Sequence, residues 1–268
     1  MAMTSFETLS RIALREHART LCERHQDAPP EAVLEAAIRH EFAGRIGLVS
    51  SFGTEAAVLL HMLSRIDPAV PVIFLDTLHH FPETLAYRDT LCERLGLQDL
   101  RIVTPHADAL QADDPTGELH RRNPDLCCHV RKTLPMLSAL QGIDCWITGR
   151  KRSQSATRAD LELFEVQDRW IKLNPLLHWG GTEVDAYFAS FDLPGHPLRA
   201  RGYASVGCAP CTRSLRPGED ARAGRWAGQA KTECGIHIEG GRVVAASAGP
   251  KPASPPRTAQ PDTSSETP

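Results

Sequence analysis

Two cysteine pairs and one separate cysteine stand where a thiol could do chemistry. Cys208 and Cys211 are three positions apart, a spacing at which two thiols can bind one metal centre. Cys127 and Cys128 form a second pair that could complete a four-thiolate site, which suits either structural zinc or an iron–sulfur cluster. Cys234 lies apart from both pairs in a polar, partly basic stretch. The pattern therefore predicts that the two pairs hold a centre while Cys234 supplies a reactive thiol.

The composition favours one large α/β domain in the cytoplasm. The chain has 268 residues and a formal net charge of -3, which indicates neither a nucleic-acid-binding nor a membrane-binding surface. No apolar run approaches the roughly 20 residues of a membrane span, and residues 1–17 lack the apolar stretch of a signal peptide. In a cytoplasmic protein, 8 cysteines indicate metal binding or thiol chemistry rather than disulfides. We interpret Cys22, Cys92 and Cys145 as structural.

Strands and helices alternate after a helical N-terminal stretch. Apolar residues at helical spacing predict helix over residues 6–43, interrupted at Pro29-Pro30. Beyond this stretch, buried strands are expected at 45–50, 71–77 and 99–103, and helices at 55–64 and 82–95. We expect Gly96 to end the second of these helices. The alternation predicts an α/β fold built on a doubly wound, mostly parallel sheet.

Polar loops follow the predicted strands at what should be one edge of the sheet. The small-residue loop from Ser50 to Thr54 joins a strand to a helix, an arrangement that aims backbone N–H groups at an anion. The alternative is a tight turn capped by Thr54. A further strand at 144–149 leads into a turn rich in cations and hydroxyls, 149–155. Because the carboxyl ends of parallel strands lie at one edge, we favour anion binding over a solvated basic turn.

The rest of the chain adds a helix, two paired strands, a basic stretch and a tail. A helix is expected to open at Cys127-Cys128 and to run to Leu140. The apolar runs at 161–165 and 170–173 predict paired strands, and a helical segment is expected to start at Asn174. The stretch after the second cysteine pair is dense in arginine. The composition of the last residues, rich in Pro, Ser, Thr and Ala, predicts a disordered tail.

Taken together, several stretches resemble the assimilatory adenylyl-sulfate (APS) and phosphoadenylyl-sulfate (PAPS) reductases. This family belongs to the adenine-nucleotide alpha-hydrolase, or PP-loop, superfamily. The combination of the two cysteine pairs with the Glu-Cys-Gly-Ile-His motif is specific to it. The matching stretches occur in family order and are Val49-Ser50-Ser51-Phe52-Gly53, Leu75-Asp76-Thr77, Phe81-Pro82-Glu83-Thr84, Tyr87-Arg88-Asp89, Cys127-Cys128, Arg131-Lys132, Thr148-Gly149, Arg152, Gln154-Ser155, Gly207-Cys208-Ala209-Pro210-Cys211-Thr212 and Glu233-Cys234-Gly235-Ile236-His237.

The resemblance implies an iron–sulfur enzyme with an adenine nucleotide alpha-hydrolase-like sheet. Members that keep both cysteine pairs are APS-reducing and carry a [4Fe–4S] cluster, so the implied ligands are Cys127, Cys128, Cys208 and Cys211. Neighbouring side chains on a helix point about 100° apart, so we expect local distortion at Cys127-Cys128. The implied regions are a helical region at 1–44, a nucleotide-binding reductase domain with the cluster site at 45–226, a mobile segment bearing the catalytic cysteine at 227–245 and a disordered tail at 246–268.

The resemblance also implies a mechanism in which the Cys234 thiolate attacks the sulfate sulfur of APS. AMP leaves, an S-sulfonated cysteine remains, and thioredoxin or glutaredoxin thiols then release sulfite. The tail is too short and polar to be a fused redox domain, which implies an external dithiol reductant, and relatives imply a homo-oligomer. We expect Lys231 and His237 to lower the pKa of Cys234 and Glu233 to oppose them.

The same resemblance assigns the substrate contacts. The loop residues would cradle the nucleotide phosphate or line the adenosine site, the end of the second strand would contact adenine or ribose, and the cations would neutralise the phosphosulfate. We expect Lys132 to couple cluster and substrate electrostatically. The complete set of implied substrate-binding residues is Ser50, Ser51, Gly53, Thr54, Leu75, Thr77, Lys132, Arg152, Arg222, Arg225 and His237.

Three other functions stay open at the level of sequence. The first is a cluster-bearing PAPS reductase, which would release sulfite and adenosine 3′,5′-bisphosphate. It would differ from an APS reductase in the cation or backbone group that contacts the ribose 3′ position. A PP-loop ATP-dependent enzyme that modifies nucleic acid is disfavoured, because Ser51-Phe52-Gly53-Thr54-Glu55-Ala56 lacks the second glycine and the aspartate of the pyrophosphate motif. A zinc-stabilised binding module would have the same cysteine pairs without Cys234 chemistry.

Overall fold

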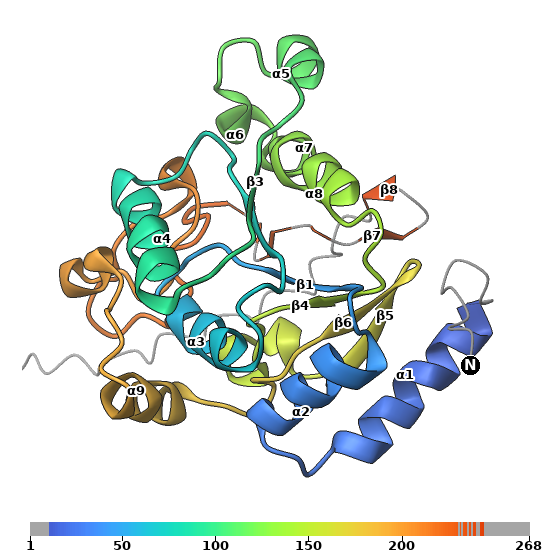
Figure 1. Ribbon diagram of the computed structural model, residues 1–268. Coiled ribbons are helices and arrows are strands. Elements are labelled where there is room, and N and C mark those ends of the chain that lie inside the picture. Colours follow the sequence, from blue (N-terminus) through green and yellow to red (C-terminus); the bar gives the residue numbers. More distant parts are fainter. Residues whose placement is uncertain are drawn as a thin grey trace, which may run out of the picture.

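A six-stranded, mostly parallel sheet forms the centre of the molecule (Figure 1). The computed structural model describes residues 11–229 together with 231, 233, 234, 236, 238, 239, 242 and 243. The strand order is β3-β2-β1-β4-β6-β5, and only β5 runs antiparallel to its neighbour. The strand bounds are β1 Ile46–Val49, β2 Val72–Leu75, β3 Leu100–Val103, β4 Cys145–Ile147, β5 Phe164–Gln167 and β6 Trp170–Leu173. The predicted doubly wound sheet and the predicted pairing of the last two strands are confirmed.

The order in which the chain adds strands to the sheet reverses at β1, and a crevice is therefore expected between β1 and β4. From β1 the chain proceeds through β2 to β3 on one side, whereas β4 and β6 lie on the other side. In open parallel sheets, a crevice forms at the carboxyl ends of the strands where the order reverses. The loops that follow β1 and β4 therefore flank one crevice.

Helices cover both faces of the sheet (Figure 1). In the view of Figure 1, α1, α2, α3 and α9 lie below the sheet, and α7 and α8 lie above it. The α-helix bounds are α1 Arg11–His25, α2 Pro30–Ala36, α3 Ala56–Ile66, α4 Pro82–Leu95, α5 Ala107–Asp113, α6 Leu119–Arg122, α7 Pro124–Cys128, α8 Leu134–Ala139 and α9 Gly181–Ser190. As predicted, α4 ends at Gly96, whose φ of 61° is left-handed.

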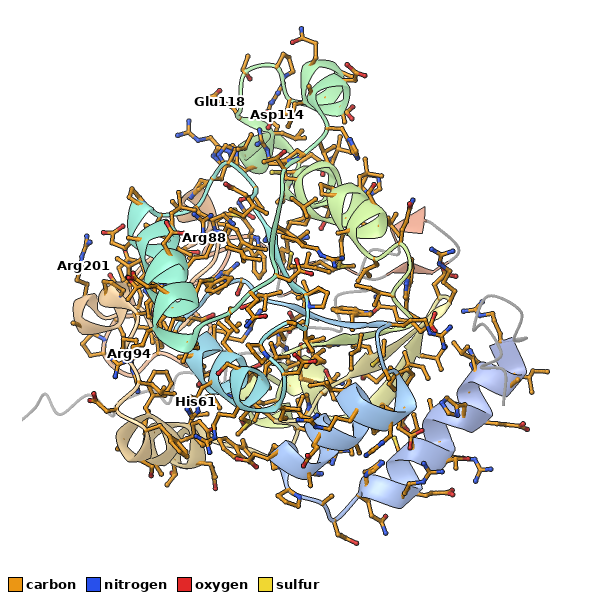
Figure 2. The ribbon with its side chains drawn as sticks, viewed as in Figure 1. His61, Arg88, Arg94, Asp114, Glu118 and Arg201 are labelled. Atoms are coloured by element: carbon orange, nitrogen blue, oxygen red, sulfur yellow. The ribbon has the colours of Figure 1, made fainter. Side chains whose placement is uncertain are left out.

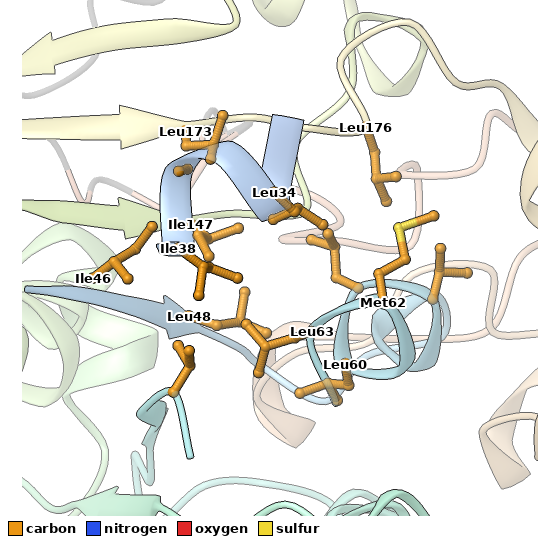
Figure 3. Close-up of a cluster of buried hydrophobic side chains, with 14 of the residues drawn as sticks. Leu34, Ile38, Ile46, Leu48, Leu60, Met62, Leu63, Ile147, Leu173 and Leu176 are labelled. Atoms are coloured by element: carbon orange, nitrogen blue, oxygen red, sulfur yellow. The ribbon is translucent and has the colours of Figure 1, made fainter. Parts of the chain in front are cut away.

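The side chains of β2 alternate between two hydrophobic cores. Val72 and Phe74 pack into the larger core with α2 and α3, whereas Ile73 and Leu75 pack into a smaller core with α8. Alternation with a period of two is what an extended strand imposes. Figure 3 shows part of the larger core, where Leu34 of α2, Ile38 of the π-helical turn Ala37–Glu41 that follows α2, and Leu60, Met62 and Leu63 of α3 meet Ile46 and Leu48 of β1, Ile147 of β4, Leu173 of β6 and Leu176.

The helix that carries the first cysteine pair is distorted, as expected. A π-helical turn, His129–Thr133, follows Cys128 directly and separates α7 from α8. Hydrogen bonds in a π turn join residues i and i+5, so such a turn holds one more residue than an α turn. The turn lets Cys127, Cys128, Arg131 and Lys132 all line the same small cavity.

One expected helix starts later than predicted, and one short hairpin was not predicted. The segment that starts at Asn174 first forms a turn, and the helix begins only at Gly181. The helix starts there because the Glu183 carboxylate accepts a hydrogen bond from the Gly180 N–H at 2.8 Å. A short hairpin of β7 Ile238–Glu239 and β8 Arg242–Val243 was not predicted. The predicted tail at 246–268 lies outside the described residues. No helix in the described part of the chain combines the length and the apolar character that crossing a bilayer demands.

Candidate active site

A cavity of about 320 Å³ lies at the carboxyl edge of the sheet, in the crevice between β1 and β4. The loop after β1 contributes Ser50, Ser51, Gly53 and Thr54, and Leu75 ends β2 beside them. The loop after β4, the π turn, the arginine-dense stretch and the Cys234 segment supply the remaining walls. The structure thus brings most of the predicted substrate-binding residues together. The lining residues among these are Ser50, Ser51, Gly53, Thr54, Leu75, Lys132, Arg222 and Arg225.

A buried phenylalanine shapes the loop after β1. Phe52 has a φ of 48°, a left-handed conformation that is unfavourable for a bulky residue. Its ring is fully buried edge-on against Phe74 at 5.5 Å, and its N–H donates to Ser50 Oγ at 3.2 Å. These contacts offset the backbone strain and leave Ser51 and Gly53 facing the cavity.

Thr54 connects this loop to the segment that carries the second cysteine pair. Its hydroxyl donates a hydrogen bond to the Ala204 carbonyl at 2.8 Å. The residue at the N-terminus of α3 is Glu55, and no side chain caps the helix. The alternative interpretation of Thr54 as a helix cap is therefore wrong.

Most cations of the cavity are paired with carboxylates. Lys151, only 2 % exposed, binds Glu55, and Arg158 and Arg222 bind Glu233. Two further cations of the lining, Lys172 and Arg150, share Glu165, a carboxylate that does not itself line the cavity. One Glu165 oxygen lies 2.6 Å from Lys172 Nζ and 3.5 Å from Arg150 Nη1. Burial lowers the pKa of Lys172 to about 8 and that of Arg222 to about 10 despite these carboxylates.

Within the described residues, Lys132 and Arg225 line the cavity without a carboxylate partner. Burial acts to lower the pKa of Lys132, but the electrostatic effect of the nearby cysteines Cys208, Cys234 and Cys128 outweighs it and raises the pKa. Lys132 is therefore a cation that faces sulfur.

Arg225 lies between Gly207 and the indole ring of Trp226. Its guanidinium carbon is 4.5 Å from the ring centroid, a cation–π contact. The guanidinium occupies the space that a Cβ on residue 207 would need, so any larger residue there would displace the Arg225 side chain. The Arg225 Nε atom is buried and has no hydrogen-bond partner among the residues that the structure describes. An unpaired buried donor favours an anionic ligand beside it.

Cys234 reaches the cavity from the C-terminal segment. Its Sγ lies 4.0 Å from Cys128 Sγ. The hydrogen bond between these two sulfurs and the charges of Lys132 and Arg225 hold the pKa of the Cys234 thiol well below its usual range, although burial opposes them. The charges of Lys132 and Arg225 beside it favour the thiolate form of Cys234. His237, the predicted neighbouring cation, lies outside the described residues.

All four paired cysteines line a second, smaller cavity adjacent to the first. Cys208 and Cys211 lie on one 3₁₀ turn, in which the Cys211 N–H donates to the Cys208 carbonyl at 3.0 Å. Burial, opposed by the charge of Arg131 and reinforced by the neighbouring Cys208 and Cys211, raises the pKa of Cys127 to about 11.

Unpaired buried nitrogens surround this smaller cavity. His79 Nε2, Arg225 Nε and Trp226 Nε1 are buried without hydrogen-bond partners in the described part of the chain, and all three residues line the smaller cavity. Within the described part of the chain, no three Cys, His, Asp or Glu side chains converge closely enough to hold a single metal ion. Four thiols with N–H donors around a shared space fit a larger, sulfur-rich group, because sulfur atoms of such a group accept hydrogen bonds.

The base of the small cavity is held by a buried ion pair. Arg131 donates to the Asp114 carboxylate at 2.6 and 3.1 Å and to the Thr77 carbonyl at 2.9 Å. Asp114, labelled in Figure 2, lies between α5 and α6. The ion pair therefore joins the segment of residues 107–122 to the π turn that follows Cys127 and Cys128.

Two predicted substrate contacts do not line the larger cavity. The Thr77 hydroxyl lies 3.3 Å from Cys208 Sγ and so faces the cysteines. Arg152 is exposed, and its Nε donates to the Leu161 carbonyl at 2.8 Å. In its place Arg158, six positions later, reaches the cavity, and nothing in the local sequence indicates this. Lys172 was also missed, although a lone lysine in an apolar buried strand is a signal of a special role.

A loop of small polar residues at the reversal of an α/β sheet and a cysteine in a basic cavity therefore meet in one crevice, the arrangement expected of an enzyme that acts on an anionic nucleotide. Residues 45–214 match the phosphoadenosine phosphosulfate reductase domain, and the chain belongs to this family.

Several relatives are similar over most of the chain. An adenosine 5′-phosphosulfate reductase of Mesorhizobium japonicum is 50% identical over 79% of this chain and 83% of its own length. A phosphoadenosine 5′-phosphosulfate reductase of Gloeobacter violaceus is 42% identical over 81% and 92%. The crystal structure of a phosphoadenylyl-sulfate reductase from Candida auris, a phosphate complex, has a TM-score of 0.64 at 28% identity, covering 78% of this chain and 98% of that chain.

Proposed function

We propose that this chain reduces adenosine 5′-phosphosulfate to sulfite and AMP, with Cys234 as the nucleophile. The observation that carries the proposal is the position of Cys234 beside Lys132 and Arg225, cations without a carboxylate partner among the described residues. The phosphosulfate group carries two negative charges and would neutralise both cations. The names of similar proteins from Mesorhizobium japonicum and Chelativorans, at 50% and 48% identity, support APS as the substrate.

The nucleotide is held by the loop after β1. Backbone N–H groups and hydroxyls of Ser50, Ser51, Gly53 and Thr54 would bind the AMP portion, with Leu75 against the adenine or ribose. Lys132, Arg222 and Arg225 would contact the phosphosulfate. We assign no substrate contact to Arg152 and Thr77, because neither lines the cavity.

In the first step, the Cys234 thiolate attacks the sulfate sulfur. An S–S bond forms between Cys234 and the SO₃ group as the S–O bond to the phosphate breaks, and AMP leaves with that electron pair. Lys132 and Arg225 offset the charge that develops on the departing phosphate oxygen. The chain then carries an S-sulfonated cysteine.

In the second step, an external dithiol supplies two electrons. One thiolate of thioredoxin or glutaredoxin attacks Cys234 Sγ, and sulfite leaves with the electron pair of the S–S bond. The second thiol of the reductant resolves the mixed disulfide, which returns Cys234 as a thiolate and leaves the reductant oxidised. Because this cycle consumes reduced dithiols, we place the reaction in the cytoplasm.

The paired cysteines would hold a [4Fe–4S] cluster. Cys127, Cys128, Cys208 and Cys211 surround one cavity, and unpaired N–H donors border it. A cluster bound there would join the two cysteine segments and add negative charge opposite Lys132. Lys132 faces a sulfur of each cysteine pair as well as Cys234. Its positive charge would lie between the negative cluster and the negative phosphosulfate and would hold the substrate in place.

Sulfite release by anaerobically purified protein tests the proposal. With thioredoxin, we expect APS to be strongly preferred over PAPS, and Cys234→Ser to release no sulfite and form no S-sulfonated protein. Cys92→Ser, a half-buried cysteine on α4, is the matched control and should keep wild-type turnover. Sulfite release by Cys234→Ser at the wild-type rate would reject the nucleophile. A preference for PAPS would instead favour the second candidate, which the Gloeobacter relative supports.

Iron and acid-labile sulfide in the same preparations test the cluster. We expect both in wild-type protein and a loss of both in Cys127→Ser and Cys211→Ser, whereas Cys92→Ser should keep them. Stoichiometric zinc without sulfide would contradict the iron–sulfur assignment.

A further inference from the structure

We propose that two anchors, one on each side of Cys234, hold its sulfur in the attacking position, and that Arg158 and Gln167 are the positioning residues that form them. The inference rests on the proposed function, since it takes Cys234 as the nucleophile. Arg158 acts through Glu233, the residue before Cys234, and Gln167 acts through the carbonyl of Ile236, two residues after it.

The first anchor is a carboxylate held by several donors. Arg158 Nε and Nη2 donate to the two oxygens of Glu233 at 2.7 and 2.8 Å, a bidentate geometry. Arg222 adds a third contact at 3.2 Å, and the Ser155 and Thr157 hydroxyls lie 3.4 Å away. The Arg158 and Glu233 side chains are 10 % and 12 % exposed, so water screens this pair little. We call these contacts the clamp. The clamp neutralises the Glu233 carboxylate and, because Glu233 directly precedes Cys234, it also restricts the backbone at Cys234.

The arginine of this clamp is itself fixed from behind. Arg158 Nη1 donates to Gln154 Oε1, and Gln154 Nε2 donates to a Glu55 oxygen at 3.1 Å. Glu55 also binds Lys151 and begins α3 directly after the nucleotide loop. The first anchor is therefore joined to the loop that would bind AMP.

The second anchor comes from the β5–β6 hairpin. Gln167 Nε2 donates to the Ile236 carbonyl at 2.7 Å. Its other amide atom, Oε1, accepts from Lys172 Nζ at 3.2 Å, which fixes the orientation of the amide. Lys172 is held in turn by Glu165 at 2.6 Å. This chain of contacts lies on the sheet edge, on a different element from Arg158.

Anchors at the positions before and two after Cys234 restrict where its Sγ can lie. Reacting atoms need to be within about 3–3.5 Å and aligned, and a misplacement of about 1 Å can slow a reaction roughly 100-fold. Among the described residues around it, Glu233, Cys234 and Ile236 lie in neither a helix nor a strand. The side-chain anchors supply that order, and we therefore expect their loss to slow attack without weakening nucleotide binding.

Single-turnover sulfonation measures the attack directly. Enzyme with its metal content intact is mixed with APS without reductant, and S-sulfonated Cys234 is followed by intact mass. We expect Arg158→Met, Glu233→Gln and Gln167→Glu each to slow its formation by about 10- to 100-fold. AMP affinity should stay within about threefold of wild type. The matched control is an exposed ion pair on α1, removed by Arg19→Met and Glu23→Gln, which should keep the wild-type rate.

Combining the variants separates a clamp from other roles. If Arg158 acts only through Glu233, the double variant Arg158→Met/Glu233→Gln is no slower than either single variant, whereas losses that multiply would overturn the clamp. Direct binding of APS by Arg158 predicts the opposite pattern: Arg158→Met would weaken AMP or APS affinity and Glu233→Gln, which frees two arginines, would strengthen it. That pattern, or a wild-type sulfonation rate in Gln167→Glu, would refute the two-anchor arrangement.

The same assay tells this inference apart from the proposed function. If wild-type protein forms no S-sulfonated Cys234 from APS, the proposed function fails. If wild-type protein forms it and all three folded variants form it equally fast, the proposed function stands and only the anchors are refuted. Thermal unfolding of each variant confirms that the comparison is made between folded proteins.

Discussion

Removing the charge of Lys132 tests the electrostatics of the site most directly. Lys132 faces Cys208, Cys234 and Cys128, and no carboxylate among the described residues neutralises it. Lys132→Met keeps an unbranched apolar side chain one heavy atom shorter and removes the ammonium group. We expect the nucleotide loop to be unaffected and the sulfonation of Cys234 to slow markedly.

The size of the effect follows from the surroundings of the charge. Two unit charges about 4 Å apart interact by roughly 4 kcal/mol at an effective dielectric constant of about 20. Loss of one preorganised group that stabilises developing charge costs about 2.7–4 kcal/mol in comparable sites. Since each 1.36 kcal/mol is tenfold in rate, sulfonation should slow by about 100- to 1000-fold.

The assay is single-turnover sulfonation from APS, with iron content and the absorption spectrum measured on the same sample. Lys132→Arg keeps the charge and serves as the matched control, with an expected loss of less than about tenfold. A Lys132→Met protein that sulfonates Cys234 within about threefold of wild type, with unchanged iron and spectrum, would refute the electrostatic role.

The remaining predictions concern the packing around the site. Gly207→Ala places a methyl group where the Arg225 guanidinium lies, so we expect a higher KM for APS while the free energy of unfolding changes by less than about 1 kcal/mol, because a flexible side chain can move aside. Arg131→Met leaves the Asp114 carboxylate buried without its cation and should cost about 3–5 kcal/mol in urea unfolding. Burial lowers the pKa of His196 from 6.5 to about 4. Between these two pH values the imidazole is protonated in the unfolded chain but not in the folded one. The free energy of unfolding therefore decreases as the pH falls from 6.5 to about 4, by at most about 3 kcal/mol. His196→Gln should remove that loss between pH 7 and pH 5.

Each of these predictions has a result that contradicts it. An unchanged KM in Gly207→Ala would mean that Arg225 does not contact the substrate. A stability loss below about 1 kcal/mol in Arg131→Met would mean that the Asp114 carboxylate is solvated after all. A urea midpoint of His196→Gln that falls with pH as steeply as that of wild type would assign the acid sensitivity to other groups.

The sheet was predictable because its strands are apolar runs followed by small or polar residues. Val72–Leu75 is buried on both faces, which leaves only apolar side chains there, and Gly96 supplies the left-handed residue that ends α4. The late start of α9 was also within reach, since Gly180 and Glu183 form a capping pair. Local chemistry decides these features, and local chemistry is what a sequence displays.

Which of the basic residues would line the cavity could not be predicted from the sequence. Arg152 and Arg158 lie in the same turn region and are chemically identical, yet Arg152 donates to a backbone carbonyl and Arg158 binds Glu233. That partner is 75 residues away in the chain, so only the folded structure selects one arginine over the other. Thr77 similarly meets Cys208 across 131 residues.

The π turn at His129–Thr133 bears on how the cysteine helix tolerates insertions and deletions. Because a π turn holds one residue more than an α turn, deleting one residue within it could restore regular α-helix on both sides. The π turn takes up its extra residue within about one turn of helix, so such a deletion would leave Cys127 and Cys128 before it and Pro135 and Met136 after it facing as they do now. Only the residues inside the turn would change direction, and Lys132 would move relative to the cavity that it lines. Shortening the chain here by a single codon would therefore disturb the charged site while the packing of α8 against β2 and β3 is kept.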